Sequence, residues 1–292
     1  MAPYKYSYTK ALLWILLSNF LVAALFFLSF SNASYERLKN AADPRFNIHY
    51  LMQTGPEKEQ LKTEYLAELL SLSQDEPVNV YQYPILEAQN KILKNPLFKT
   101  VSIKRVTPDA LLIDYTIRKP IAFLYNRSNT ALDSEGKLFP FSPFYTPKKL
   151  PWIYLNEALF LKNEAIWGKN LTFGEDKLKP ISLFNEIKKY SLQFDLNLSS
   201  VDFSKIEESI FAKREIVLMA TTNISYKNDP QKLFFIRLPV YDLKEAFEKL
   251  GSLKKYLQMR ERDKKSIYIL DLRQKELVLF KKVGGGNLPS GL

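Results

Sequence analysis

The chain has 292 residues, of which 46% are apolar and 14% aromatic, so it can bury one or two hydrophobic cores and extensive disorder is not expected. It contains no cysteine, which excludes disulfides, cysteine nucleophiles and cysteine-ligated metals. Its single histidine, His49, falls in an alternating segment that predicts an outward-facing strand position. Neither a zinc enzyme nor a Ser–His hydrolase is therefore indicated.

The formal net charge is +11 at neutral pH, which raises the question of a nucleic-acid partner. Lysine and arginine are spread along the chain among acidic residues, and even the densest stretch, 254–265, contains Glu261 and Asp263. No zinc-finger or RNP pattern accompanies the charge. We therefore interpret it as a solvated basic face with no nucleic-acid partner. Attraction to anionic lipid headgroups is a natural secondary role for such a face near a membrane.

An apolar segment near the N-terminus predicts one membrane-spanning helix. Residues 11–31 carry no charge, and ~20 apolar residues suffice for a helix to cross a bilayer. Ser18 and Asn19 are polar, but uncharged groups are tolerated there and can face a partner helix. A cleaved signal peptide is the alternative, because the small residues at 31–33 suit a signal peptidase. A typical signal core has only ~7–15 apolar residues, so we favour an uncleaved anchor.

The charges beside this segment do not decide its orientation. Lys5 and Lys10 precede it together with the terminal amine, and Arg37, Lys39 and Arg45 follow it. Long domains translocate largely regardless of charge. We therefore expect the short stretch before the helix to stay in the cytoplasm, and the bulk of the chain to lie outside it.

Beyond the anchor, hydrophobic periodicity predicts an α+β fold. Two helices and three strands are expected in the order strand, helix, helix, strand, strand, at 45–52, 57–72, 84–95, 101–104 and 111–118. A proline-containing turn at 107–110 joins the last two strands into a hairpin with one apolar face. The rest, to residue 283, is rich in short strands and has two helices, from 177 and from 242. A flexible tail is expected at 284–292.

No arrangement of residues predicts catalysis. Asp133 and Glu135 could mimic the carboxylate pair of a glycosidase, but that reaction needs a defined separation and a sugar cleft. Two acidic side chains beside a glycine turn are more often ordinary polar residues of a loop. The hairpin region, 95–120, holds no nucleophile–base pair, metal-ligand cluster or glycine loop. We therefore predict a protein that is not an enzyme and has no catalytic residue, cofactor or metal.

An ordered set of short motifs resembles one protein family. The motifs are a proline-anchored helix end and hairpin closing with Arg118, Pro120 and Ala122, a turn with Asp133 and Gly136, the pair Leu150-Pro151, and the element Asp271-Leu272-Arg273. In this order, and over nearly the whole chain, they resemble the FtsQ/DivIB family of bacterial cell-division proteins. The chain departs from the family pattern at Ile117, where the family has glutamate, and at Gln274, where it has tyrosine. It also lacks the family's glycine in the final hairpin.

The resemblance implies a domain organisation. Residues 1–10 would be a cytoplasmic tail, 11–31 the transmembrane helix, 44–120 a POTRA domain and 121–283 a β domain. The implied location is the division site of the cell inner (plasma) membrane, as a single-pass protein with an extracytoplasmic body.

The resemblance also implies a non-catalytic scaffold. It would recruit FtsB/DivIC-like and FtsL-like bitopic proteins, and link them indirectly to wall synthases of the FtsW and FtsI types. The alternative is a POTRA-containing factor for protein transport or outer-membrane assembly. Such proteins typically repeat the module and end in a barrel, whereas one module is expected here.

The last predicted strand, 275–282, is the first candidate partner site. With only the segment 266–272 beside it, its other edge could accept a partner strand through backbone hydrogen bonds. Nearby lysines would resist indiscriminate edge aggregation and could pair with acidic groups. The candidate residues are Arg273, Gln274, Lys275, Glu276, Leu277, Val278, Leu279 and Phe280. The alternative is an interior strand with ordinary core residues.

The hairpin of the expected POTRA domain is the second candidate. In the family that this chain resembles, the domain is associated with recruitment to the division complex. The corresponding surface would comprise Lys104, Arg105, Asp114 and Arg118. The alternative is that the hairpin only holds the two helices in place and its edge binds nothing.

Overall fold

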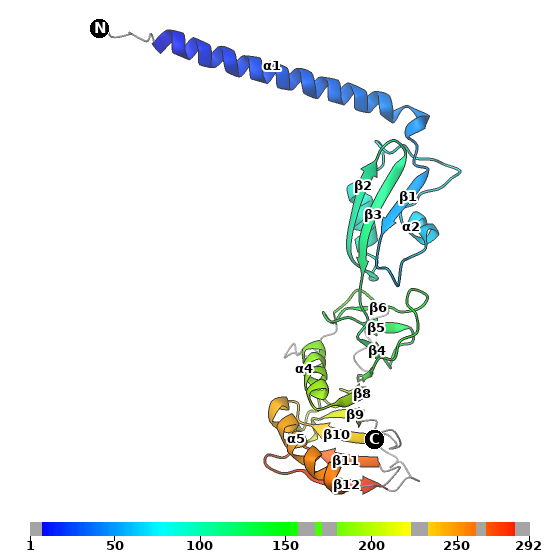
Figure 1. Ribbon diagram of the computed structural model, residues 1–292, viewed down its shortest axis with the longest axis vertical. Helices are drawn as coiled ribbons and strands as arrows, with labels where there is room; N and C mark the ends of the chain where they lie inside the picture. The colour runs from blue at the N-terminus through cyan, green and yellow to red at the C-terminus, as the bar shows by residue number, and fades with distance from the viewer. Residues whose placement is uncertain (1–7, 157–166, 171–179, 223–232, 261–266, 284–292) are drawn as a thin grey trace. The chain divides into compact units, whose positions relative to one another are not determined.

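The computed structural model describes residues 8–156, 167–170, 180–222, 233–260 and 267–283 (Figure 1). Helices and strands are mixed, and a long apolar helix precedes the sheets, which confirms the expected α+β class. The expected flexible tail at 284–292 lies outside the described residues. The chain forms two compact units, Met1–Leu93 with Thr100–Thr116, and Lys94–Lys99 with Ile117–Leu292.

The first helix, α1, spans Tyr8–Ala41 and is long and apolar enough to cross a membrane. Its most apolar part has a mean hydropathy of 2.4. A helix rises about 1.5 Å per residue, so the 34 residues of α1 are longer than a hydrocarbon core of about 30 Å requires. The helix therefore continues beyond the uncharged segment 11–31 into polar sequence.

The first strand begins later than predicted. Pro44–Phe46 form a short 3-10 helix, η1, because the carboxylate of Asp43 accepts a hydrogen bond from the backbone N–H of Arg45 at 3.0 Å. The strand β1 then spans Tyr50–Thr54. The prediction of a strand from residue 45 was therefore wrong for its first residues. His49, just before β1, is exposed as expected.

The first unit contains a three-stranded sheet in the order β1-β3-β2. Its other elements are α2 (Thr63–Leu69), α3 (Ile85–Leu93), β2 (Phe98–Val106) and β3 (Ala110–Ile117). Strand β1 is parallel to β3, and the chain order of strands and helices is the predicted one. Leu66 of α2, Ile92 of α3 and Ile113 of β3 are each 0% exposed, so apolar residues of both helices and the central strand form the core.

The helix α2 is shorter than the predicted helix 57–72, and Tyr115 gives a physical reason. The hydroxyl of Tyr115 accepts a hydrogen bond from the backbone N–H of Leu61 at 2.9 Å and donates one to Gln53 at 3.0 Å. Its ring also lies so close to Gly55 that a Cβ there would collide with it. These contacts bind the segment before α2 in a non-helical path, and burial raises the pKa of the Tyr115 hydroxyl.

The second unit is built on a nine-stranded sheet in the order β12-β11-β10-β9-β8-β7-β4-β5-β6. Its strands are β4 (Ala122–Leu124), β5 (Thr130–Leu132), β6 (Leu138–Pro140), β7 (Trp152–Tyr154), β8 (Leu196–Asp202), β9 (Ile216–Thr222), β10 (Leu233–Leu238), β11 (Ile267–Asp271) and β12 (Leu279–Val283). The pairs β4–β7, β7–β8 and β10–β11 are parallel, and the other neighbours are antiparallel. The sheet is therefore mixed.

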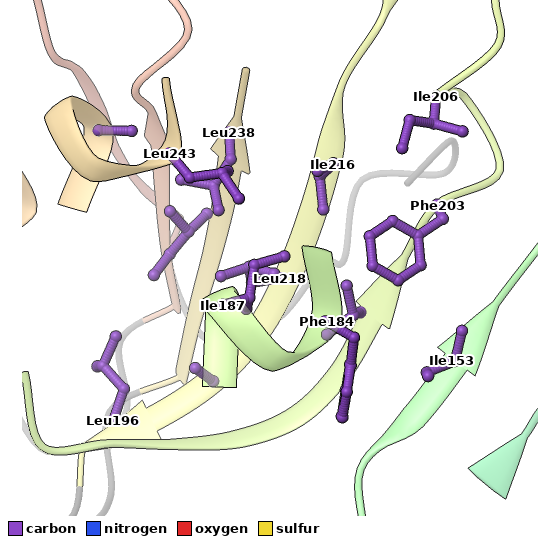
Figure 2. Close-up of a cluster of buried hydrophobic side chains, with 14 of the residues drawn as sticks. Ile153, Phe184, Ile187, Leu196, Phe203, Ile206, Ile216, Leu218, Leu238 and Leu243 are labelled. Carbon is purple, nitrogen blue, oxygen red and sulfur yellow. The ribbon is translucent and has the colours of Figure 1, made fainter. Parts of the chain in front are cut away.

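Two helices, α4 (Pro180–Gln193) and α5 (Leu243–Arg260), pack on this sheet. Figure 2 shows Phe184 and Ile187 of α4 beside Leu218 of β9, and all three are 0% exposed. Tyr190 of α4 stacks on Phe247 of α5 with ring centroids 5.0 Å apart. Burial of these side chains is the main favourable contribution to the stability of the unit.

Gly251 lies inside α5, where glycine costs about 1 kcal/mol relative to alanine. A Cβ at this position would lie only 3.3 Å from two atoms of the Phe194 ring and closer still to a third. The Phe194 ring is itself stacked on Phe247, with an interplanar angle of 11°, so it has little room to move. The close approach of α5 to Phe194 therefore accounts for the glycine.

We predict that Gly251→Ala destabilises the protein although it improves helix propensity. Overpacking a well-filled site typically costs about 1–3 kcal/mol, which outweighs a propensity gain of about 1 kcal/mol. Denaturant unfolding of the full-length protein in detergent micelles measures this difference. The exposed neighbour Ser252 is the matched control, and Ser252→Ala should change the unfolding free energy by less than about 0.5 kcal/mol. A Gly251→Ala variant more stable than the wild type contradicts the prediction.

Candidate functional site

Strand β12 lies at one end of the nine-stranded sheet. Among the described residues, its only hydrogen-bonded neighbour is β11, with which it pairs antiparallel from Ile267↔Val283 to Asp271↔Leu279. One edge of β12 thus carries backbone groups that no described strand pairs. Such an edge is the part of a sheet that can accept another strand.

This strand begins at Leu279, not at residue 275 as predicted. Residues 274–276 form a turn, and Glu276 has a positive φ of 59°. That left-handed conformation is incompatible with an extended strand, so β12 can begin only after Glu276. Of the residues predicted to form the edge, only Leu279 and Phe280 belong to the strand itself.

At the opposite end of the sheet, the start of β6 is covered. There, the backbone of β6 hydrogen-bonds to a neighbouring segment, with Gly168 N–H donating to Leu138 O at 2.7 Å and Leu138 N–H donating to Lys169 O at 3.2 Å. Lys137 also forms a bridge with Asn170. Residues 168–170 therefore cover this edge, whereas no described segment covers the edge of β12.

Apolar side chains are exposed at β12. Leu277 and Leu279 are each 52% exposed and Phe280 is 43% exposed. The ring of Phe280 stacks on the buried Tyr268 of β11, with centroids 5.5 Å apart, so one side of Phe280 is anchored. Val278 packs against the core. The edge therefore presents a small apolar surface with one immobilised aromatic ring.

The turn before β12 is held by helix α5. Lys249 donates a hydrogen bond to the backbone oxygen of Gln274 at 2.9 Å and forms an ion pair with Glu245 at 2.9 Å. The hydrogen bond from Lys249 lowers the pKa of Glu245, and the nearby Lys275 and the backbone N–H of Glu276 act in the same direction. The side chains of Gln274, Lys275 and Glu276 are all exposed.

An ionic network fixes the ends of three strands beside this turn. The carboxylate of Glu215, which is 3% exposed, contacts Lys205 at 3.0 Å, Arg237 at 2.6 Å and Arg273 at 3.2 Å. Asp271, at the end of β11, contacts Arg273 at 2.8 Å and Arg237 at 3.2 Å. Together these contacts join the start of β9, the end of β10 and the end of β11.

Arg273 was predicted to be a partner contact, and the structure places most of it inside this network. Its side chain is 21% exposed, and its guanidinium donates hydrogen bonds to both oxygens of Asp271. The Asp271 hydrogen bond raises the pKa of Arg273, which keeps the guanidinium charged. Arg273 therefore positions the turn before β12 and has little surface left to offer a partner.

The Asp271–Arg273 pair predicts a pH dependence. Burial raises the pKa of Asp271, but the hydrogen bonds from Arg273 outweigh burial and hold this pKa below its usual value. A carboxylate with a lowered pKa in the folded state stabilises the protein fully above its unfolded pKa of about 4. That stabilisation is lost as the pH falls through the folded pKa.

We therefore expect Asp271→Asn to lower the unfolding free energy at pH 7 by about 1.5–3 kcal/mol, because hydrogen bonds to a charged partner are lost. The difference from the wild type should begin to shrink as the pH falls below about 4, where the unfolded wild-type chain binds the proton, and should disappear below the lowered pKa of the folded Asp271. Denaturant unfolding at a series of pH values measures both effects. Curves for the two proteins that stay parallel down to the lowest pH contradict the prediction.

On the hairpin, Lys104 and Asp114 are exposed, as predicted. They alternate along their strands with buried residues, in phase with Thr100 and Thr116, whose hydroxyl oxygens lie 2.6 Å apart. Since side chains two apart share a face of a sheet, all four lie on the outer face of the hairpin.

Arg105 lies on the other face of β2. Its guanidinium donates hydrogen bonds to the backbone oxygens of Val80 at 2.7 Å and Tyr83 at 2.9 Å. Arg105 therefore ties β2 to the segment that leads into α3. The structure does not place it on the same surface as Lys104 and Asp114.

Arg118 was expected on an exposed recruitment surface, and this expectation was wrong. Its side chain is only 8% exposed, and its guanidinium contacts Asp133 at 2.6 Å and the backbone oxygen of Pro96 at 3.1 Å. Asp133 in turn accepts hydrogen bonds from the backbone N–H groups of Glu135 and Lys137, each at 2.9 Å. The carboxylate thus shapes the turn and neutralises a buried cation, which explains both residues structurally.

Replacing one partner of this pair should be costly. We predict that Asp133→Ala lowers the unfolding free energy by about 3–5 kcal/mol, because it leaves the buried guanidinium of Arg118 with only the exposed Glu135, at 3.3 Å, as a counter-charge. Removing both charges in Arg118→Met with Asp133→Leu should recover the part of the loss that comes from the poorly paired guanidinium, but not the part that comes from the two turn hydrogen bonds to Asp133. The exposed partner Glu135 is the control, and Glu135→Gln should cost no more than about 1 kcal/mol. Equal effects of Asp133→Ala and Glu135→Gln in denaturant unfolding contradict the prediction.

A second exposed aromatic surface was not predicted from the sequence. Tyr125 and Trp152 are 59% and 44% exposed, and Tyr125 stacks on Tyr154 with ring centroids 4.2 Å apart. Phe123 lies 5.1 Å from Trp152 between ring centroids. The alternation of aromatic residues in β4 and β7 is visible in the sequence. Their proximity depends on the parallel pairing of two strands far apart in the chain, which the sequence pattern does not reveal.

Among the described residues, no group of three or more histidine, aspartate or glutamate side chains could hold a metal ion. No protein-family model matches the chain, and no curated protein matches it. The resemblance to the FtsQ/DivIB family therefore stays a prediction from the residues that carry it.

Proposed function

We propose that this protein is a membrane-anchored, non-catalytic scaffold that binds a partner by strand addition at the edge of β12. The observation that carries the proposal is the combination, at one sheet end, of an edge that no described strand pairs with exposed apolar side chains. The other end of the same sheet is covered by residues 168–170, so an uncovered edge is not a general feature of this sheet.

The chemistry of the edge defines the partner segment. Backbone groups of an added strand would pair with β12, while alternate side chains contact Leu279 on one face and Phe280 on the other. Lys275 and Lys281 are exposed beside this surface. An extended segment that alternates apolar residues and carries acidic residues at its ends fits this combination of apolar and basic groups.

The cellular role is proposed from the resemblance to FtsQ/DivIB proteins together with α1. In this proposal α1 spans the inner membrane with its N-terminus in the cytoplasm, and residues 44–120 form a POTRA domain. The partners are FtsB/DivIC-like and FtsL-like bitopic proteins, through which the scaffold is linked to FtsW- and FtsI-type wall synthases at the division site. Lys104 and Asp114 on the hairpin are the residues left for a separate recruitment surface.

In-cell photo-crosslinking tests the proposal. A photoreactive amino acid is placed singly at Leu277, Leu279, Phe280 and Lys281, with the exposed α4 residue Glu186 as the control position. We expect adducts to small single-span membrane proteins of the division complex from the edge positions and none from Glu186. Adducts are identified by mass spectrometry.

A matched variant separates specific binding from proximity. Leu279→Asp should reduce the adduct yield from Lys281 about tenfold or more, because loss of a hot-spot anchor at an interface costs about 2 kcal/mol or more. Glu186→Lys should leave that yield unchanged. Edge adducts only to outer-membrane assembly or transport factors would overturn the division role, and no adducts at all would overturn strand addition at β12.

A further inference from the structure

Asn19 places an amide near the middle of the predicted membrane span. It lies two residues from the centre of the uncharged segment 11–31. With a rise of about 1.5 Å per residue, that puts its Cα about 3 Å from the middle of the hydrocarbon core when α1 crosses a bilayer. At this depth no water is present to hydrogen-bond a polar side chain.

Ser18 and Asn19, the two adjacent polar residues of this segment, differ in whether their side chains are hydrogen-bonded within the helix. The hydroxyl of Ser18 donates a hydrogen bond to the backbone oxygen of Ile15 at 2.9 Å, within the same helix. In the part of the chain that the structure describes, the side chain of Asn19 has no hydrogen-bond partner. Its amide offers two donors and an acceptor, and leaving them unpaired in hydrocarbon is unfavourable. A hydrogen-bonding group on another helix would satisfy Asn19 at this depth.

The face of α1 that carries Asn19 is suited to contact with another helix. Residues three, four and seven positions apart share one side of a helix, which places Ile15, Ala23 and Phe26 with Asn19. The small side chain of Ala23, one turn from Asn19, lets a second backbone approach closely. Phe26 and Phe30 stack along the same side, with ring centroids 6.4 Å apart. None of the apolar window of α1 is buried by the rest of the described chain.

We propose that this face binds α1 of a second copy of the same chain, through hydrogen bonds between the two Asn19 side chains. Identical chains insert with the same orientation, so their Asn19 residues lie at the same depth without any further adjustment. An amide carries both donors and an acceptor, so two asparagines are complementary across a two-fold axis. This inference rests on α1 spanning a membrane and does not depend on the proposed division role.

Disulfide trapping locates the contact face. Because the chain has no native cysteine, only the introduced cysteines can cross-link. The full-length protein is reconstituted in phosphatidylcholine vesicles with one cysteine introduced at a time. Oxidation should cross-link Ile15→Cys, Ala23→Cys and Phe26→Cys strongly. Leu17→Cys, Leu21→Cys and Leu28→Cys lie on the opposite side of the helix and should cross-link weakly.

Energy transfer between labelled copies measures the strength of association. Labels are attached at Arg37→Cys, beyond the uncharged segment, and the protein-to-lipid ratio is varied. Asn19→Leu should raise the apparent dissociation constant about 3- to 30-fold, the range typical of interhelical hydrogen bonds in membranes. Asn19→Gln should retain association. Ser18→Ala should behave like the wild type, because the Ser18 hydroxyl is hydrogen-bonded within its own helix.

Two results would overturn the proposal. One is equal association of Asn19→Leu and the wild type, or equal cross-linking from both sides of α1, which means that Asn19 does not define the contact. The other is the absence of self-association in vesicles together with cross-links from the Asn19 face to a different single-span protein in native membranes. In that case the partner helix belongs to another protein.

Discussion

The end of the large sheet depends on one nearly buried carboxylate, that of Glu215. It draws Arg237 from β10 and Arg273 from the connection after β11 to the same point, and Asp271 completes the network. A buried carboxylate is tolerated only with well-placed counter-charges, so each member of the network restricts the positions of the others. The backbone before β12 is thereby fixed, and the strand is held at the sheet end with its outer edge unpaired by any described segment.

The motifs that resemble FtsQ/DivIB proteins turn out to have structural roles. Arg118 and Asp133, from two different motifs, form one buried ion pair, and Asp271 and Arg273 belong to the network around Glu215. The side chains exposed at the candidate edge, Leu277 and Leu279, lie outside these motifs. A resemblance carried by such motifs therefore indicates a fold more directly than it indicates a partner, and partner choice rests on the edge residues.

The two proposed interactions act together if both are correct. An association of α1 helices through Asn19 would place two copies of the β12 edge on one assembly. A partner that also self-associates in the membrane would then bind two edges at once, and its apparent affinity would rise without any new contact. A weak individual strand addition would in this way suffice for a lasting complex.

The sequence by itself determined the apolar helix, the alternation of strands and helices, and the α+β class, because these follow from the local periodicity of apolar residues. It also indicated the last strand as an edge. Only the tertiary structure decided that Arg118 is buried, that Arg105 and Arg273 hold the fold, and that the strand starts at Leu279. The reason is physical: whether a charged side chain faces water or a counter-charge depends on residues far away in the chain. Local structure also departs from the apolar periodicity. The distant hydroxyl of Tyr115 holds the segment before α2 out of the predicted helix, and the left-handed Glu276 shortens the predicted last strand.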